Sequence, residues 1–156
     1  MKVYKLSLIV LLSLIHLGCA ITINLDASNY DPQCLITVKD ERVEAPSIID
    51  SRGLEFIPNP SVKEALYANL CSRESLRKKE LNVIITDLSV VSPVTSKMFV
   101  KIDTKVSHNG IVTDLYDGAK DTGEFVWRYV AVEKLTNQTI KSYSDKLEKL
   151  VLQDIK

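Results

Sequence analysis

Alternating apolar and polar positions predict three consecutive strands in the second half of the chain. The first covers residues 81–91, and its alternation slips by one position near Asp87-Leu88, which indicates a β-bulge. The second alternates over residues 97–106. Asn109-Gly110 then favours a tight hairpin, because both residues tolerate positive φ, and the third strand returns over residues 111–116. These strands are predicted to form an antiparallel meander.

Two other segments repeat apolar residues every three to four positions, which predicts helices. The first begins at Ser61-Val62-Lys63-Glu64, a capping-box sequence in which the Ser hydroxyl and the Glu carboxylate each bind a free backbone N–H. It ends near residues 73–79. The second covers residues 132–155 and carries its charged residues on the opposite side, so we expect it to lie across the sheet.

The first half of the chain has fewer strand signals. Residues 34–40 are rich in β-branched side chains and predict the first core strand. Residues 43–58 contain Pro46, Gly53 and Pro58 and predict a loop with one short strand near residues 54–57. The whole pattern indicates an α+β fold, with a mainly antiparallel sheet and two helices packed on one face.

The first 18 residues resemble a bacterial lipoprotein signal peptide. Lys2 and Lys5 precede an apolar run at residues 6–17, which is shorter than the roughly 20 residues of a membrane-spanning helix. Gly18 supplies the small residue before Cys19, which would carry the lipid after cleavage. His16 departs from the pattern, because an aliphatic residue usually stands three positions before the cysteine.

Cys19 sets the expected location. A mature lipoprotein of this pattern carries three acyl chains, which anchor stably where a single chain binds only marginally. Ala20 after the cysteine favours the periplasmic face of the outer membrane. An uncleaved anchor and secretion to the periplasm without modification of Cys19 are the alternatives. We therefore expect a signal peptide at residues 1–18, a lipidated N-terminus and tether at 19–33, and a single α+β domain at 34–156.

Composition and charge narrow the class of function. The chain of 156 residues has 20 basic and 20 acidic residues with no block of one sign, which argues against a nucleic-acid partner. No catalytic motif, cofactor motif or metal-ligand spacing is visible, so we expect neither an enzyme nor a bound cofactor or metal. His108 is interpreted as a hairpin residue. The acidic residues Asp40, Glu41, Glu44 and Asp50 are interpreted as a solvated loop.

Cys34 and Cys71 remain as a pair once Cys19 is lipidated. The oxidising periplasm permits a disulfide between them. Two buried free thiols are the alternative, because cysteine also behaves as a small apolar residue.

Phe125, Trp127 and Tyr129 are the candidate partner contact, since they share one face if this stretch is extended and aromatic residues are frequent at binding hot spots. The alternative is that these rings pack under the last helix. The irregular segment at residues 46–57 is a second candidate surface.

Several of these features together resemble the YajG-like family of small bacterial lipoproteins. They are Cys19, the strand ending at residues 38–42, the apolar spacing of residues 62–70, the strand at 81–88, the hairpin at 106–110 and the helix ending at 152–155. The resemblance implies a periplasm-facing lipoprotein with no assigned catalysis, and related architectures occur in lipoprotein auxiliaries of envelope transport systems. We expect a membrane-anchored, non-catalytic interaction or accessory module of an envelope complex, which predicts an exposed apolar patch. The alternative is a lipid- or small-ligand-binding carrier, which predicts a deep apolar pocket.

Overall fold

The strands form two sheets. The computed structural model describes residues 20–27, 33–91, 97–121 and 128–153. The three-stranded sheet has the order β1-β4-β3, with β1 at Ile21–Asn24, β3 at Ile48–Ile49 and β4 at Glu55–Asn59. The four-stranded sheet has the order β2-β5-β6-β7, with β2 at Ile36–Asp40, β5 at Leu81–Val91, β6 at Phe99–His108 and β7 at Ile111–Lys120. The helices are α2 (Val62–Cys71), α3 (Glu74–Arg77) and α4 (Arg128–Gln153).

The α+β class is confirmed, but the expectation of one mainly antiparallel sheet is wrong. Both sheets are mixed: β1 pairs parallel with β4, and β2 pairs parallel with β5. The chain between β2 and β5 crosses over through α2, and a crossover of this length returns the next strand in the same direction. The alternation along each strand does not carry this information.

The meander of β5, β6 and β7 is antiparallel as predicted. The register of β5 against β6 shifts between Ile85 and Asp87, which confirms the bulge. Asn109 and Gly110 have φ of 52° and 79°, the positive values that a two-residue hairpin of this kind requires. The strands therefore reverse at the position that the Asn-Gly pair indicates.

The N-terminal segment belongs to the domain in its described part, so the expectation of a tether is wrong for residues 20–27. Ile23 is fully buried, and Leu25 is nearly so. The backbone N–H of Asn24 donates to Glu133 Oε2 on α4 at 2.7 Å, and Asn137 Nδ2 on the same helix donates to the carbonyl of Asn24 at 3.1 Å. Pairing with β4 and contact with α4 hold β1 in place.

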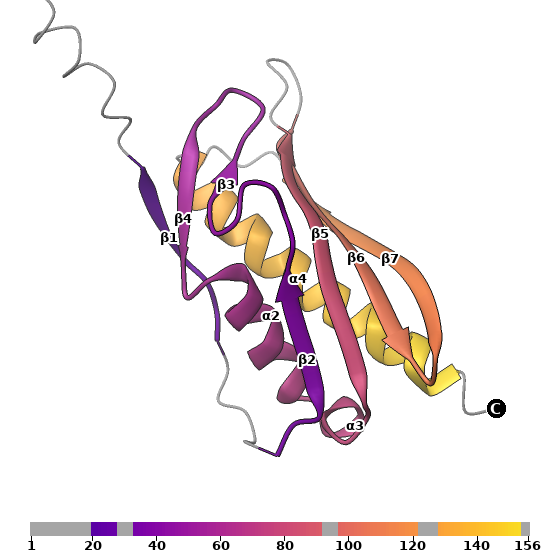
Figure 1. The fold of residues 1–156 in the computed structure, drawn as a ribbon. Helices are drawn as coiled ribbons and strands as arrows, with labels where there is room; N and C mark the ends of the chain where they lie inside the picture. The colour runs from indigo at the N-terminus through magenta and orange to yellow at the C-terminus, as the bar shows by residue number, and fades with distance from the viewer. Residues whose placement is uncertain (1–19, 28–32, 92–96, 122–127, 154–156) are drawn as a thin grey trace, which may run out of the picture.

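Helices α2 and α4 pack against each other and against the four-stranded sheet, α2 on β2 and α4 on β6 and β7 (Figure 1). Between sheet and helices, large side chains are buried, including Leu66, Ile102, Tyr143 and Leu147. The Tyr143 hydroxyl lies 2.7 Å from Thr104 Oγ1, which in turn donates to the carbonyl of Leu115 at 3.0 Å. Burial raises the pKa of Tyr143, so the hydroxyl stays protonated.

Local sequence signals fix the first helix. Glu64 Oε2 accepts from the backbone N–H of Ser61 at 2.9 Å, and Ser61 Oγ accepts from the N–H of Glu64, so the capping box is present. The other end of α2 carries Cys71, which forms a disulfide with Cys34 immediately ahead of β2, with the two Cα atoms 5.6 Å apart. Of the two states left open for this pair, the structure has the disulfide, which ties the end of the helix to the strand on which it packs.

Candidate functional site

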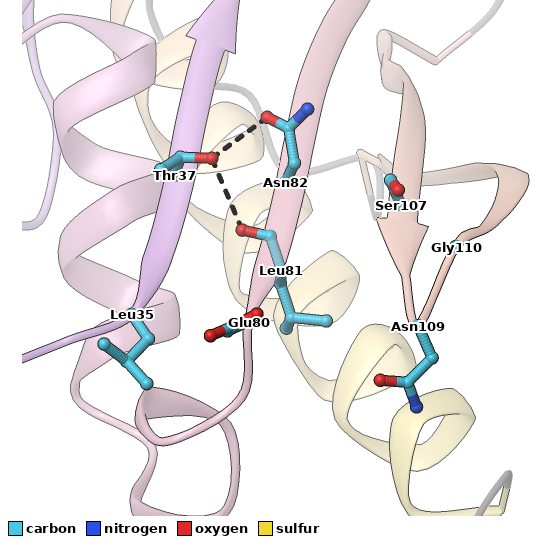
Figure 2. Close-up of a pocket in the computed structure, with 8 residues that line it drawn as sticks. All are labelled: Leu35, Thr37, Glu80, Leu81, Asn82, Ser107, Asn109 and Gly110. Carbon is cyan, nitrogen blue, oxygen red and sulfur yellow. Dashed lines mark hydrogen bonds between the residues drawn. The ribbon is translucent and has the colours of Figure 1, made fainter.

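A surface pocket of about 350 Å³ lies at the hairpin end of the four-stranded sheet (Figure 2). It spans the ends of β2, β5 and β6 and the turn between β6 and β7. The residues that line it are mostly polar and exposed, and they are Leu35, Thr37, Glu80, Leu81, Asn82, Ser107, Asn109 and Gly110. We refer to this surface, together with the exposed hairpin residues Ile111 and Val112, as the hairpin-end surface.

Strand register brings the polar side chains of the pocket into one row. Thr37 pairs with Asn82 across β2 and β5, and Asn82 pairs with Ser107 across β5 and β6. Adjacent strands lie about 4.8 Å apart, so hydroxyl, amide and hydroxyl groups follow one another at that spacing. Residues distant in the sequence thus form a continuous polar strip on the sheet face opposite the helices.

Hydrogen bonds orient this strip. The Thr37 hydroxyl lies 3.0 Å from Asn82 Oδ1 and 3.4 Å from the carbonyl oxygen of Leu81, so it donates its single proton within the row. The amide nitrogen of Asn82 points away from Thr37 (Figure 2). The pocket therefore offers uncharged donors and acceptors with one carboxylate, that of Glu80, which suits polar contacts with a partner.

His108 lies beside this pocket in the role predicted for it. Its Nδ1 is 3.3 Å from the carbonyl oxygen of Glu80, and its Nε2 is 3.2 Å from Asn109 Nδ2. Both ring nitrogens thus face groups of neighbouring loops and turns. Within the described parts of the chain, no three His, Cys, Asp or Glu side chains gather as metal ligands would.

Exposed apolar side chains border the polar strip. Leu35 is 52% exposed at the β2 side, and Val112, which pairs with Ser107 across β6 and β7, is 65% exposed at the other. Ile111 beside it is 66% exposed. Apolar flanks around polar groups are a combination found at protein interfaces.

The residues that the sequence singled out do not lie at this surface. Cys19, Phe125 and Trp127 fall outside the described residues. Tyr129 lies in the first turn of α4 and is exposed, so the extended alternation assumed for residues 125–129 is wrong at its last position. Of the second candidate surface at residues 46–57, Ile49, Leu54 and Ile57 are partly exposed.

The acidic residues of the first loop are not brought together, and the interpretation as a solvated loop is wrong for two of them. Asp40 forms an ion pair with Arg42 at 2.7 Å. The Asp50 side chain is fully buried, and its Oδ2 accepts from the Arg128 guanidinium at the start of α4. Burial by itself would raise the pKa of Asp50, but hydrogen bonds from the backbone N–H groups of Arg52 and Leu54 and the charge of Arg128 hold it below its usual value.

The row of Thr37, Asn82 and Ser107 was not found from the sequence. Each residue is an ordinary polar position on the wet side of a strand, and their alignment depends on the pairing between strands. The hairpin motif before Ile111 and Val112 was visible, but their exposure depends on where α4 ends.

Comparison with known proteins gives a likeness in fold alone. No family model and no curated protein matches the chain. One solved structure, protein XCC0632 from Xanthomonas campestris of family DUF330, is similar with a TM-score of 0.54 and 11% identity over 85% of this chain and 95% of that one. A crystal structure titled only as an uncharacterized protein is similar with a TM-score of 0.50 and 11% identity over 83% of this chain and 99% of that one.

At such low identity these similarities show a shared fold and no shared activity. The resemblance to the YajG-like lipoproteins stays a prediction. Among the helices that the structure describes, none combines the length and the apolar character needed to cross a membrane.

Proposed function

We propose that the protein is a non-catalytic interaction or accessory module, anchored in the bacterial outer membrane by lipid on Cys19 and docked on an envelope complex at the periplasmic face. The anchor rests on the signal-like sequence that ends at Cys19. The docking role rests on the hairpin-end surface. Its gathering of Leu35, Ile111 and Val112, each more than half exposed, is the observation that carries the proposal.

The filled interior favours this role over that of a carrier. A carrier for lipid or a small apolar ligand needs an apolar cavity. The side chains between helices and sheet instead include Leu66, Leu70 and Leu147, which are fully buried within one cluster with Tyr143. The pocket of Figure 2 is polar and open, and so is another of about 320 Å³ lined by Asp26, Asn69, Asn137, Gln138 and Lys141.

The anchor is tested with Cys19→Ser in the full chain. Metabolic palmitate labelling and sedimentation with membranes should both be lost, because no acyl chain is attached. Retention of label and of membrane association by the variant would contradict the proposed anchor.

The docking role is tested by photo-crosslinking in intact envelopes. A photoreactive residue at Val112 or Leu35 should give one discrete adduct with an envelope protein. The matched control is Lys63, which is exposed on α2. Absence of adducts at all three positions, or equal adducts at Lys63, would count against the hairpin-end surface as the docking site.

A further inference from the structure

The strand β7 forms one edge of the four-stranded sheet and pairs only with β6. His108 pairs with Ile111 across the two-residue turn, so alternate residues from Ile111 onward direct their backbone groups to β6. The backbone N–H and C=O groups of Val112, Asp114, Tyr116 and Gly118 therefore point outward, where a further strand would add.

Side chains cover the half of this edge that is remote from the hairpin. Lys146 Nζ on α4 donates to the carbonyl of Tyr116 at 2.7 Å. Asp117 Oδ1 accepts from the N–H of Gly118 at 2.9 Å, and the same carboxylate accepts from the Ser142 hydroxyl at 2.7 Å. Such contacts keep an edge from pairing with another chain.

The half next to the hairpin lacks this protection. Among the described residues, no hydrogen bond reaches the outward backbone groups of Val112 or Asp114. Ile111 and Val112 lie on opposite faces of the strand at this point, and both are about two-thirds exposed. Only another extended backbone matches a row of outward N–H and C=O groups, so the occupant is a strand.

The charges around the free half favour an acidic strand. Lys105 lies opposite Asp114 across β6 and β7, and Lys146 reaches the edge from α4. Lys149 is exposed three residues further along that helix, on the same side. Lys101 is balanced by its ion pair with Asp103 at 2.8 Å. The remaining ammonium groups outnumber the Asp114 carboxylate.

A second copy of the chain fits this edge less well. Antiparallel pairing of two free halves would centre on Thr113 and set Asp114 of one copy beside Val112 of the other. That arrangement places a charge against an apolar side chain on both sides of the symmetry axis.

We propose that residues 111–114 of β7 accept a short, extended, acidic segment of the partner as an added strand. This inference rests on the proposed docking function and names the chemistry of the partner. Backbone hydrogen bonds at Val112 and Asp114 hold the segment, and its carboxylates lie near Lys105, Lys146 and Lys149.

The test uses the full chain in detergent micelles and two labelled heptapeptides, Thr-Glu-Val-Thr-Val-Glu-Thr and the same sequence with Lys in place of Glu. The acidic peptide should bind at least about tenfold more tightly by fluorescence anisotropy. It should also slow deuterium uptake over residues 111–116. Equal affinity of the two peptides, or unchanged uptake at this edge, overturns the proposal without reliance on any variant.

Two pairs of variants sharpen the result. Asp114→Pro removes an outward N–H that β6 does not use, whereas Asp114→Asn keeps the N–H and removes the charge. Binding should fall at least about tenfold in the first and persist in the second. Lys149→Glu should weaken binding, and Lys63→Glu, the same charge change on α2, should leave it unchanged. Wild-type affinity in a folded Asp114→Pro variant overturns the proposal.

The outcomes also separate this inference from the docking function. A dimer in sedimentation that Asp114→Pro abolishes would identify a second copy as the occupant and overturn the acidic segment. Crosslinks from Val112 that survive Asp114→Pro would leave docking in place and overturn strand addition.

Discussion

Removal of the disulfide should be the most costly single covalent change in this domain. We consider the variant with Cys34→Ala and Cys71→Ala together, which leaves no unpaired thiol at the site. Cys71 is buried within the core cluster and Cys34 packs against it, so alanine at both positions leaves a small space but exposes no polar group. The main loss is the constraint on the unfolded chain.

The magnitude follows from the loop that the bond closes. The two cysteines are 37 residues apart. In the chain-entropy model a loop of this length contributes about 4 kcal/mol to the free energy of unfolding at 25 °C. That is a large share of the roughly 5–15 kcal/mol by which single domains are stable. Without the crosslink the unfolded chain is also less compact, so the slope of the free energy against urea should increase.

Urea denaturation followed by circular dichroism measures both quantities. With a slope of about 2 kcal/mol per molar urea, the midpoint should fall by about 2 M. Wild-type protein in reducing buffer should behave like the double variant, and the double variant should not respond to the reductant. A midpoint that falls by less than about 0.5 M would refute the reasoning, since the loop could not then be constraining the unfolded state.

Three further changes have defined costs. Thr104→Val leaves the buried hydroxyl of Tyr143 without its partner and should lower the free energy of unfolding by about 1–3 kcal/mol. Gly118→Ala should cost about 1–3 kcal/mol, because an added Cβ would lie 2.7 Å from a Phe99 ring carbon and 2.7 Å from a backbone oxygen. Asp50→Asn should destabilise the protein at neutral pH, and its difference from wild type should shrink as the pH falls below about 4.

The sign of the pH effect follows from the lowered pKa of Asp50. A carboxyl whose folded pKa is below its unfolded value contributes stability above the unfolded pKa, and that contribution is lost as pH falls through the folded one. Urea midpoints at pH 3 and pH 6 test it, and an equal difference at both would contradict it. For the core pair, adding Tyr143→Phe to Thr104→Val should recover stability. For the glycine, Thr113→Ala on the same strand serves as control, and an equal cost would exclude the steric cause.

Local features were predictable because they depend on neighbouring residues. The capping box at Ser61 and Glu64 and the hairpin at Asn109-Gly110 each follow from a few adjacent groups. The bulge near Asp87 follows from one slip in alternation. Two-residue and three-to-four-residue periodicity also marked the long strands and α4, so the α+β class could be predicted.

The position of the candidate site could not be predicted in the same way. The aromatic run at residues 125–129 attracted attention by composition, while the hairpin-end surface is made of ordinary residues such as Thr37 and Val112. Its existence depends on which strands are neighbours and on which edge of β7 the side chains of α4 cover.

The sequence by itself determined where strands, helices and turns begin and which side chains face inward, since periodicity and capping act within a few residues. Only the tertiary structure decided that β1 joins the domain, that β2 lies parallel to β5, and that Asp50 meets Arg128, 78 residues away. The physical reason is that such pairings gain their energy from burial and from hydrogen bonds between distant segments. That energy depends on how all the elements pack together.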